Sequence, residues 1–155
     1  MARVNPIPEG SHSVQPYLIF AGCVEAMEFY KKAFGARELM CMKGPEGRVG
    51  HAEMQIGDSH IMMADEHPEI EAYGAKHYGG SPVSLMLYTE DCDAMYRQAL
   101  TAGAQSLREP ADQPYGIRMS GVLDPFGYKW WIGTQIKTMT AGEIEQATLA
   151  THGTV

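Results

Sequence analysis

Apolar and polar residues alternate at every second position along several short stretches in the first half of the chain. This is the period of a strand with one buried face, and glycine or proline lies near the ends of most of these stretches. It predicts strands over residues 14–20, 37–42, 49–56 and 59–65. Between the first two strands, apolar residues recur at the spacing of a helix with one buried face, which predicts a helix over residues 23–34.

The same order of elements returns after Pro82. Asp91 is a good N-terminal cap and Gly103 a good C-terminal one, so the helix of this half is predicted between them. The predicted elements are strands over residues 83–88, 104–109, 117–123 and 129–135 and a helix over residues 92–102.

Three segments have no clear period. Residues 1–13 are predicted to form an arm, and residues 66–82, which are punctuated by glycine and proline, a linker or lid. Residues 136–155 form a tail. In it, Thr140 and Glu143 have the spacing of a capping box, ahead of a short helix that runs to about Leu149.

An internal repeat determines the predicted fold class. The two matching segments are Tyr30-Lys31-Lys32-Ala33-Phe34-Gly35-Ala36 and Tyr96-Arg97-Gln98-Ala99-Leu100-Thr101-Ala102-Gly103-Ala104. Each half of the chain is predicted as strand, helix, strand, strand, strand, so the repeat is a duplicated module. The fold class is therefore α+β, with two paired βαβββ modules, residues 14–65 and 83–135, in one structural domain. We expect their sheets to form a shared cleft, which would be the default ligand site.

The last module ends in an Asp-Pro turn, a glycine and a strand that carries both tryptophans, Asp124-Pro125-Phe126-Gly127-Tyr128-Lys129-Trp130-Trp131. Together with the helix end Phe29–Ala36 and the hairpin His51–Ser59, this stretch resembles the vicinal oxygen chelate superfamily. That superfamily groups glyoxalase, bleomycin resistance proteins and extradiol dioxygenases, and the closest resemblance is to its PhnB-like branch. The resemblance covers roughly residues 14–135 and implies the paired βαβββ fold. It is less specific for function, because the superfamily contains several chemistries and some pure binders.

Enzymes of this superfamily hold a divalent metal with His, Glu or Gln side chains from both modules. The resemblance places those ligands at Gln15, on or near Met63, at Ser84 and at Trp131. Only Gln15 is a good donor for a hard metal ion, since a thioether is soft and an indole offers no donor. We therefore expect no metal at these positions and no other cofactor.

A displaced metal site is an alternative. His51 and Glu53 lie two residues apart on one predicted strand, so their side chains point to the same face. They would be ligands of a divalent metal if His60 or Asp65 joined them across the hairpin. We favour a simpler interpretation, a partly exposed face on which His51 and Glu53 hydrogen-bond to each other, because two ligands alone make a weak metal site.

Strand alternation instead predicts a cleft lined by aromatic, thioether and a few polar side chains. The predicted lining is Gln15, Tyr17, Met63, Ser84, Met86, Tyr88 and Trp131. Such a lining suits a flat or apolar small molecule, because methionine adapts to shape and aromatic rings stack. The sequence thus predicts a metal-independent small-molecule-binding protein of the glyoxalase/bleomycin-resistance type. The alternatives are a divalent-metal-dependent lyase, isomerase or dioxygenase with displaced ligands, and a protein with a fully packed cleft that acts through its dimer surface.

Composition narrows the partners. At 155 residues with a formal net charge of -7 and scattered basic residues, the chain is a poor match for nucleic acid or an anionic membrane. No apolar run approaches the roughly 20 residues that span a bilayer, and the amino terminus lacks the apolar centre of a signal peptide.

The cysteines Cys23, Cys41 and Cys92 form no Cys-x-x-Cys pair, which suits a reducing compartment, so we expect a cytoplasmic protein. We expect Cys23 and Cys92, at the predicted helix starts, to be buried apolar residues. The expected partners are a small-molecule ligand and a second copy of the chain, in a homodimer whose modules residues 66–82 would allow to exchange.

Overall fold

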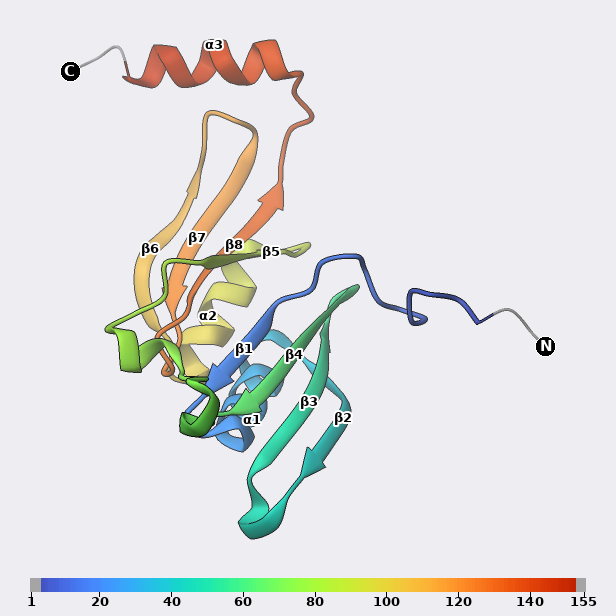
Figure 1. Ribbon diagram of the computed structural model, residues 1–155. Helices are drawn as coiled ribbons and strands as arrows, with labels where there is room; N and C mark the ends of the chain where they lie inside the picture. The colour runs from blue at the N-terminus through green and yellow to red at the C-terminus, as the bar shows by residue number, and fades with distance from the viewer. Residues whose placement is uncertain (1–3, 153–155) are drawn as a thin grey trace. The chain divides into compact units, whose positions relative to one another are not determined.

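A computed structural model describes residues 4–152 (Figure 1). The chain divides into two units, residues 1–81 and 82–155, and each has a four-stranded sheet of its own. The α+β class and the two βαβββ modules predicted from the sequence are confirmed. The shared cleft between the two sheets stays a prediction.

The first unit has the strand order β1-β4-β3-β2, in which β1 is parallel to β4 and the other neighbours are antiparallel. A parallel pair needs a crossover connection, and α1 provides it. The elements are β1 (Tyr17–Phe20), α1 (Cys23–Phe34), β2 (Arg37–Lys43), the short 3-10 helix η1 (Pro45–Gly47), β3 (Val49–Ile56) and β4 (Ser59–Asp65).

The second unit repeats this topology with the order β5-β8-β7-β6, and β5 is parallel to β8. A further helix, α3, follows its last strand (Figure 1). The elements are β5 (Ser84–Tyr88), α2 (Cys92–Ala102), β6 (Gln105–Asp112), β7 (Ile117–Leu123), β8 (Lys129–Gln135) and α3 (Ala141–His152).

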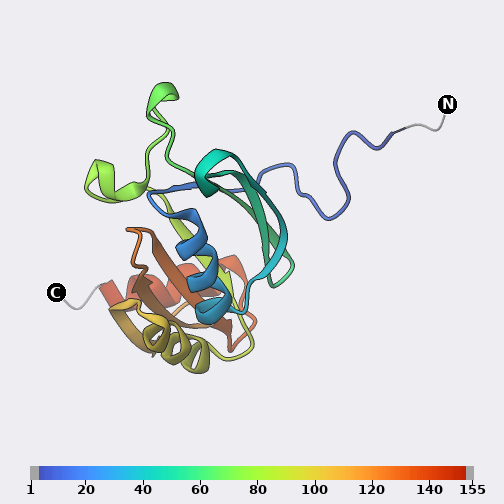
Figure 2. The ribbon, with the colours of Figure 1, turned by 90° about the horizontal axis from the view of Figure 1, so that it is seen from below.

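One face of each sheet is covered by the helix of its own unit. In the first unit, Figure 2 shows α1 along one side of the sheet, where the Phe20 ring meets Tyr30 edge-on at 6.0 Å between ring centroids. The buried side of α1 includes Ala26 and Phe29, whereas the apolar Val24 is 36% exposed. The opposite face of each sheet is left uncovered by its own helix.

Both helices begin on the same kind of hydrogen bond. The Cys23 N–H donates to Asp65 Oδ1 at 2.7 Å, and the Cys92 N–H donates to Thr134 Oγ1 at 2.8 Å. Each acceptor lies near the end of the strand that runs parallel to the one preceding the helix. The first N–H groups of a helix have no partner within it, so these side chains fix where each helix starts against its sheet.

Element ends differ from the prediction where a strand lies at the edge of a sheet. β1 begins at Tyr17 rather than residue 14, and β6 continues through Pro110 to Asp112 instead of ending at Glu109. Proline is tolerated in β6 because an edge strand has one side without a ladder partner, and its pairing with β7 is irregular there.

The tail helix is longer than expected, and its predicted cap is present. The Thr140 N–H donates to Glu143 Oε2 at 2.7 Å, as a capping box requires. Neither α3 nor any other helix within residues 4–152 is long and apolar enough to cross a membrane.

Residues 66–82 contain two short 3-10 helices, η2 (Pro68–Ile70) and η3 (Ala75–Tyr78). The Tyr73 ring stacks on His77 with 3.9 Å between centroids, and the Gly74 N–H donates to Glu66 Oε1 at 2.8 Å. The segment therefore has local structure of its own. Its role as a linker or lid stays a prediction.

Candidate functional site

The uncovered face of the second sheet carries four of the seven predicted lining residues. The pairing of β5 with β8 aligns Met86 with Trp131, so both side chains point to the same side. Ser84 and Tyr88, two positions away from Met86 on either side, point there as well. The neighbouring Trp130 is 3% exposed and points the other way, into the core.

Two glycines make this face flat. Gly121 of β7 is aligned with Trp131, and a Cβ at Gly121 would lie 2.5 Å from Cζ3 of that indole. A Cβ at Gly133 would lie 2.5 Å from Met86 Cε and 3.1 Å from Ile117 Cγ2. The absence of side chains at these positions lets the indole and the thioether lie directly on the sheet, so the glycines are part of the site.

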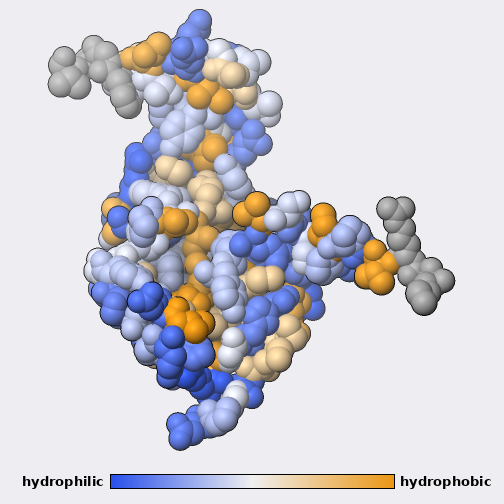
Figure 3. Space-filling view, viewed as in Figure 1, coloured by the Kyte–Doolittle hydropathy of each residue, from blue (hydrophilic) through white to orange (hydrophobic). Residues whose placement is uncertain are grey.

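Several apolar side chains of this face are accessible. Met86 is 40% exposed and Tyr88 63% exposed. Figure 3 shows one side of the molecule, on which hydrophobic residues are exposed among hydrophilic ones. Accessible methionine and tyrosine next to a half-buried Trp131 form a surface on which a planar apolar molecule can stack.

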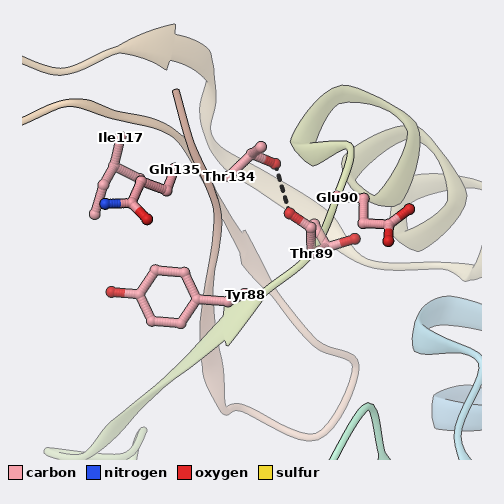
Figure 4. A pocket seen from close by; sticks show the side chains of 6 residues that line it. All are labelled: Tyr88, Thr89, Glu90, Ile117, Thr134 and Gln135. Carbon is pink, nitrogen blue, oxygen red and sulfur yellow. Dashed lines mark hydrogen bonds between the residues drawn. The ribbon is translucent and has the colours of Figure 1, made fainter. Parts of the chain in front are cut away.

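A cavity of about 780 Å³ opens at the end of this face. Its lining comes from β5 and the turn after it, β7 and β8: Tyr88, Thr89, Glu90, Ile117, Thr134 and Gln135. Figure 4 shows Tyr88 on the same side of the strands as Ile117 and Gln135, while Thr134 donates to the Thr89 carbonyl at 2.8 Å. The size is within the range of small-molecule sites.

Of these residues, the sequence predicted only Tyr88. Ile117 and Gln135 are aligned across β7 and β8, a register that alternation within each strand does not reveal. A partial signal was available, because Gln135 lies four residues after Trp131 on the same strand and so points to the same side.

The turn that feeds β8 is held by a buried carboxylate. Asp124 is 3% exposed, and its Oδ1 accepts the N–H groups of Phe126 and Tyr128, both at 2.9 Å. Its Oδ2 accepts the indole N–H of Trp130 at 3.1 Å. Because Trp130 is anchored in the core in this way, the next residue, Trp131, must point to the uncovered face.

On the first sheet, Tyr17 lies on the uncovered face and Met63 does not. Met63 is aligned with Leu18 of β1 and is fully buried, so its predicted place in the lining is corrected to the core. The preceding residue, Met62, is aligned with Tyr17 and points to the uncovered side. A shift of one residue along a strand moves a side chain to the other face, which is why the carry-over by position failed here.

Gln15 lies outside the sheet, ahead of β1. Its Oε1 accepts the His12 N–H at 3.2 Å, so its side chain is used within the arm.

His51 and Glu53 lie on the uncovered face of the first sheet and hydrogen-bond to each other, as the simpler interpretation expected. The His51 Nε2 is 3.2 Å from Glu53 Oε1, and its Nδ1 is 3.1 Å from the hydroxyl of Tyr17. Both ring nitrogens are therefore engaged, and neither is free to bind a metal ion without losing a hydrogen bond.

The expected third metal ligands do not join this pair. The carboxylate of Asp65 accepts the N–H groups of Cys23 and Val49, both at 2.7 Å, and the Nδ1 of His60 is buried without a hydrogen-bond partner. Within residues 4–152, no three His, Cys, Asp or Glu side chains lie together as a metal site would require. The donor sets at both the implied and the displaced positions thus do not fit a divalent metal.

The cysteines at the two helix starts are buried, as expected. Burial, with a further contribution from the charge of Asp65, raises the pKa of the Cys23 thiol to about 12. A helix amino terminus alone would lower a thiol pKa, so desolvation prevails over the helix dipole here. Cys23 is therefore not a nucleophile at neutral pH.

Comparison with known proteins points to one family. The family model described as "Glyoxalase/Bleomycin resistance protein/Dioxygenase superfamily" matches residues 18–132. The uncharacterized protein Mb0911c from Mycobacterium bovis is 34% identical over 144 residues, which cover 91% of this chain and 94% of that protein. The Escherichia coli protein YjdN is 28% identical over 142 residues and covers 77% of this chain and 92% of its own length.

Solved structures show the same fold. The gene product At5g48480 of Arabidopsis thaliana is 27% identical with a TM-score of 0.64 and covers 78% of this chain and 97% of its own. A PhnB protein from Bacillus cereus, 19% identical, has a TM-score of 0.61 and covers 79% of this chain and 99% of its own.

Proposed function

Because the chain belongs to the glyoxalase/bleomycin resistance protein/dioxygenase superfamily, we propose that it binds an apolar or aromatic small molecule without a metal ion. The ligand lies against the uncovered face of the second sheet. The observation that carries this proposal is the indole of Trp131, which lies on Gly121 where a side chain would displace it, beside the accessible Met86 and Tyr88.

The surrounding residues support a binding site of low polarity. Trp131 supplies a ring for stacking, and the Met86 thioether adjusts to the outline of a ligand. The adjoining cavity adds the Gln135 amide and the Glu90 carboxylate at one end, so a ligand with a polar group at one edge would be oriented.

A metal-dependent lyase, isomerase or dioxygenase is the rival function, since the superfamily contains such enzymes. The chemistry of the implied ligand positions argues against it. Trp131 has no atom that can bind a metal ion, Met63 is in the core, and the Gln15 side chain accepts the His12 N–H. Metal analysis of protein purified without added metal tests this point. Stoichiometric metal that is lost in His51→Ala would contradict the proposal.

Binding is tested with N-phenyl-1-naphthylamine, a neutral apolar dye that becomes fluorescent when it is bound. We expect saturable binding to the wild type and an affinity loss of about tenfold or more in Trp131→Ala, because a stacking partner and its buried area are removed. Retained affinity in Trp131→Ala, or no saturable binding to the wild type, would contradict the proposal.

The chain offers a matched control for the same titration. Tyr88 is 63% exposed on the site face, and Tyr78 is 65% exposed in η3, outside both sheets. Tyr88→Ala should weaken dye binding and Tyr78→Ala should not. Equal effects of the two substitutions would show that the dye binds exposed aromatic residues without selectivity.

We also propose that the protein is a cytoplasmic homodimer with exchanged modules. Exposed apolar side chains on β2, the edge strand of the first sheet, support association, since large apolar areas are usually covered: Met40 is 40% exposed and Met42 58% exposed. The three cysteines are free, which is compatible with a reducing compartment.

A further inference from the structure

Tyr17, His51 and Glu53 form a continuous hydrogen-bonded chain on the uncovered face of the first sheet. The Tyr17 hydroxyl lies 3.1 Å from Nδ1 of His51, and Nε2 of His51 lies 3.2 Å from Oε1 of Glu53. Tyr17 comes from β1 and the other two residues come from β3, so these hydrogen bonds connect two strands that do not pair with each other. The proposed ligand site on the second sheet does not use these residues.

The chemistry of the three groups fixes the direction of the hydrogen bonds. An ionised carboxylate only accepts, so the Nε2–H of His51 donates to Glu53. A neutral imidazole then has its lone pair at Nδ1, and the Tyr17 O–H donates to it. The proton of Tyr17 is thus directed at His51, and the Tyr17 oxygen presents only lone pairs to a molecule that approaches it.

Of the three hydrogen-bonded residues, Tyr17 is the most exposed. The side chains of His51 and Glu53 are 26% and 24% exposed, whereas Tyr17 is 50% exposed. A ligand would therefore meet the tyrosine hydroxyl first, and the imidazole and the carboxylate would act through it.

The residues beside His51 and Glu53 are mostly apolar. Strand pairing places Met42 beside His51, and Met40 and Met62 on either side of Glu53. Low polarity strengthens hydrogen bonds and charge pairing within such a network. Among the other titratable residues on the neighbouring strands, Arg37 and His60 are aligned with Gln55, the next residue of β3 on this face, and Lys43 is aligned with Val49, two residues before His51.

The tyrosine does not ionise by itself near neutral pH. Burial, with a smaller contribution from Cys23, raises the pKa of Tyr17 above its ordinary value. Tyr17 can therefore accept a proton only while it passes its own proton to His51.

We propose that Glu53, His51 and Tyr17 form a proton relay that takes the hydroxyl proton of an acidic phenol or enol bound at this face. The O–H bond of the ligand breaks and its proton goes to the Tyr17 oxygen. The former Tyr17 proton moves to His51 Nδ1, and the resulting imidazolium is paired with the Glu53 carboxylate. No group is oxidised or reduced. The ligand stays bound as an anion that accepts a hydrogen bond from Tyr17.

The relay selects the acidity of the ligand. The proton ends on an imidazole, which is a weak base, so only an acidic ligand hydroxyl can give it up. Phenols with electron-withdrawing substituents and enols of 1,3-dicarbonyl compounds meet this condition, and aliphatic alcohols do not. This inference rests on the proposed function for the class of ligand, an aromatic or apolar small molecule, and adds the acidic hydroxyl.

The test uses 4-nitrophenol, whose anion is yellow and whose neutral form is nearly colourless. The probe is titrated with protein at a pH about one unit below its own pKa, where the free probe is mostly neutral. We expect the wild type to increase the anion absorbance, with an apparent pKa of the bound probe about one unit lower, so that the anion-to-neutral ratio of the bound probe is about tenfold that of the free probe. Tyr17→Phe and His51→Gln should abolish the increase, and Glu53→Gln should reduce it.

Two controls separate the relay from binding itself. Tyr78→Phe and His77→Gln make the same changes in residues 66–82, and the anion signal should persist in both variants. 4-Nitroanisole has the same ring without the hydroxyl, and equilibrium dialysis should show that wild type and Tyr17→Phe bind it equally. That result also shows that Tyr17→Phe is folded.

The remaining outcomes contradict the relay, and they show whether the proposed function fails with it. If the wild type binds 4-nitrophenol but keeps it neutral, or if the anion signal survives Tyr17→Phe and His51→Gln, the relay is wrong and the proposed function stands. If neither 4-nitrophenol nor 4-nitroanisole binds the wild type, the relay fails. The dye titration with Trp131→Ala then decides separately whether the proposed function fails with it.

Discussion

Gly121 has a specific packing role beneath Trp131. Its backbone does not require positive φ, so the reason for a glycine is space: a Cβ would lie 2.5 Å from Cζ3 of the indole. Gly142 of α3 has no atom within 4 Å of an added Cβ and provides a contrast.

Gly121→Ala should therefore displace the indole and weaken dye binding, at a cost of about 1–3 kcal/mol in the free energy of unfolding. Gly142→Ala should leave dye binding unchanged. Dye titration and urea denaturation measure the two effects. Full affinity in Gly121→Ala would show that the position of the indole does not matter for binding.

Cys23 links the stability of the first unit to pH. Its pKa rises from 9.0 to about 12 on folding, so the folded state prefers the protonated thiol. The stabilisation is fully present below pH 9 and is lost as the pH rises from 9 towards 12, because the unfolded state releases the proton first.

We expect the free energy of unfolding, measured in urea, to fall more steeply between pH 9 and pH 11 in the wild type than in Cys23→Ala. The comparison between variants removes the contribution of the lysines and tyrosines that titrate in the same range. Parallel pH profiles of the two proteins would contradict this assignment.

At the scale of elements, α1 and α2 both start on a bond to a strand side chain but differ at the N-cap residue. The Asp91 side chain accepts the Ala94 N–H at 2.9 Å at the start of α2. The corresponding residue of α1, Gly22, has no side chain to accept such a bond, and α1 depends on Asp65 instead.

Asp91→Ala should reduce the free energy of unfolding by about 1 kcal/mol, the usual value of an N-cap side chain. Asp91→Asn should retain most of the stability, because its amide oxygen can still accept the bond. Urea denaturation at neutral pH measures both. Equal losses in the two variants would indicate that the charge of Asp91, rather than its capping bond, is what matters.

Helix bounds were predicted better than strand faces, for a physical reason. The helices over residues 23–34 and 92–102 have the predicted ends, since apolar periodicity and a left-handed glycine, Gly35 or Gly103, are local signals. The face to which Met63 points depends on its alignment with Leu18, a residue far away in the sequence. Alternation gives two faces but does not say which one the helix covers.

At the scale of the whole molecule, apolar side chains are exposed on the edge strand β2 of the first sheet. Met40 is 40% exposed and Met42 58% exposed. Apolar residues that are exposed in this way favour association, and a second copy of the chain is the simplest partner.

We expect light scattering to give twice the chain mass of 17.0 kDa at micromolar protein concentration. Met42→Glu together with Met40→Glu should shift the protein towards the monomer, because two charges are placed on the edge strand β2, at the other side of the sheet from Tyr17 of β1. Tyr78→Glu, outside the sheets, should have no such effect. A monomeric wild type at this concentration would contradict the homodimer.

The sequence by itself determined the duplicated βαβββ modules, the ends of α1 and α2 and the strand that carries Trp131. These follow from periodicity, from glycine and from the turn at Asp124, all of which act over a few residues. Only the tertiary structure decided that Met63 is core, that Gly121 lies beneath Trp131 and that Tyr17 joins His51 and Glu53. Those relations depend on strand register, which is set by packing between residues distant in the chain.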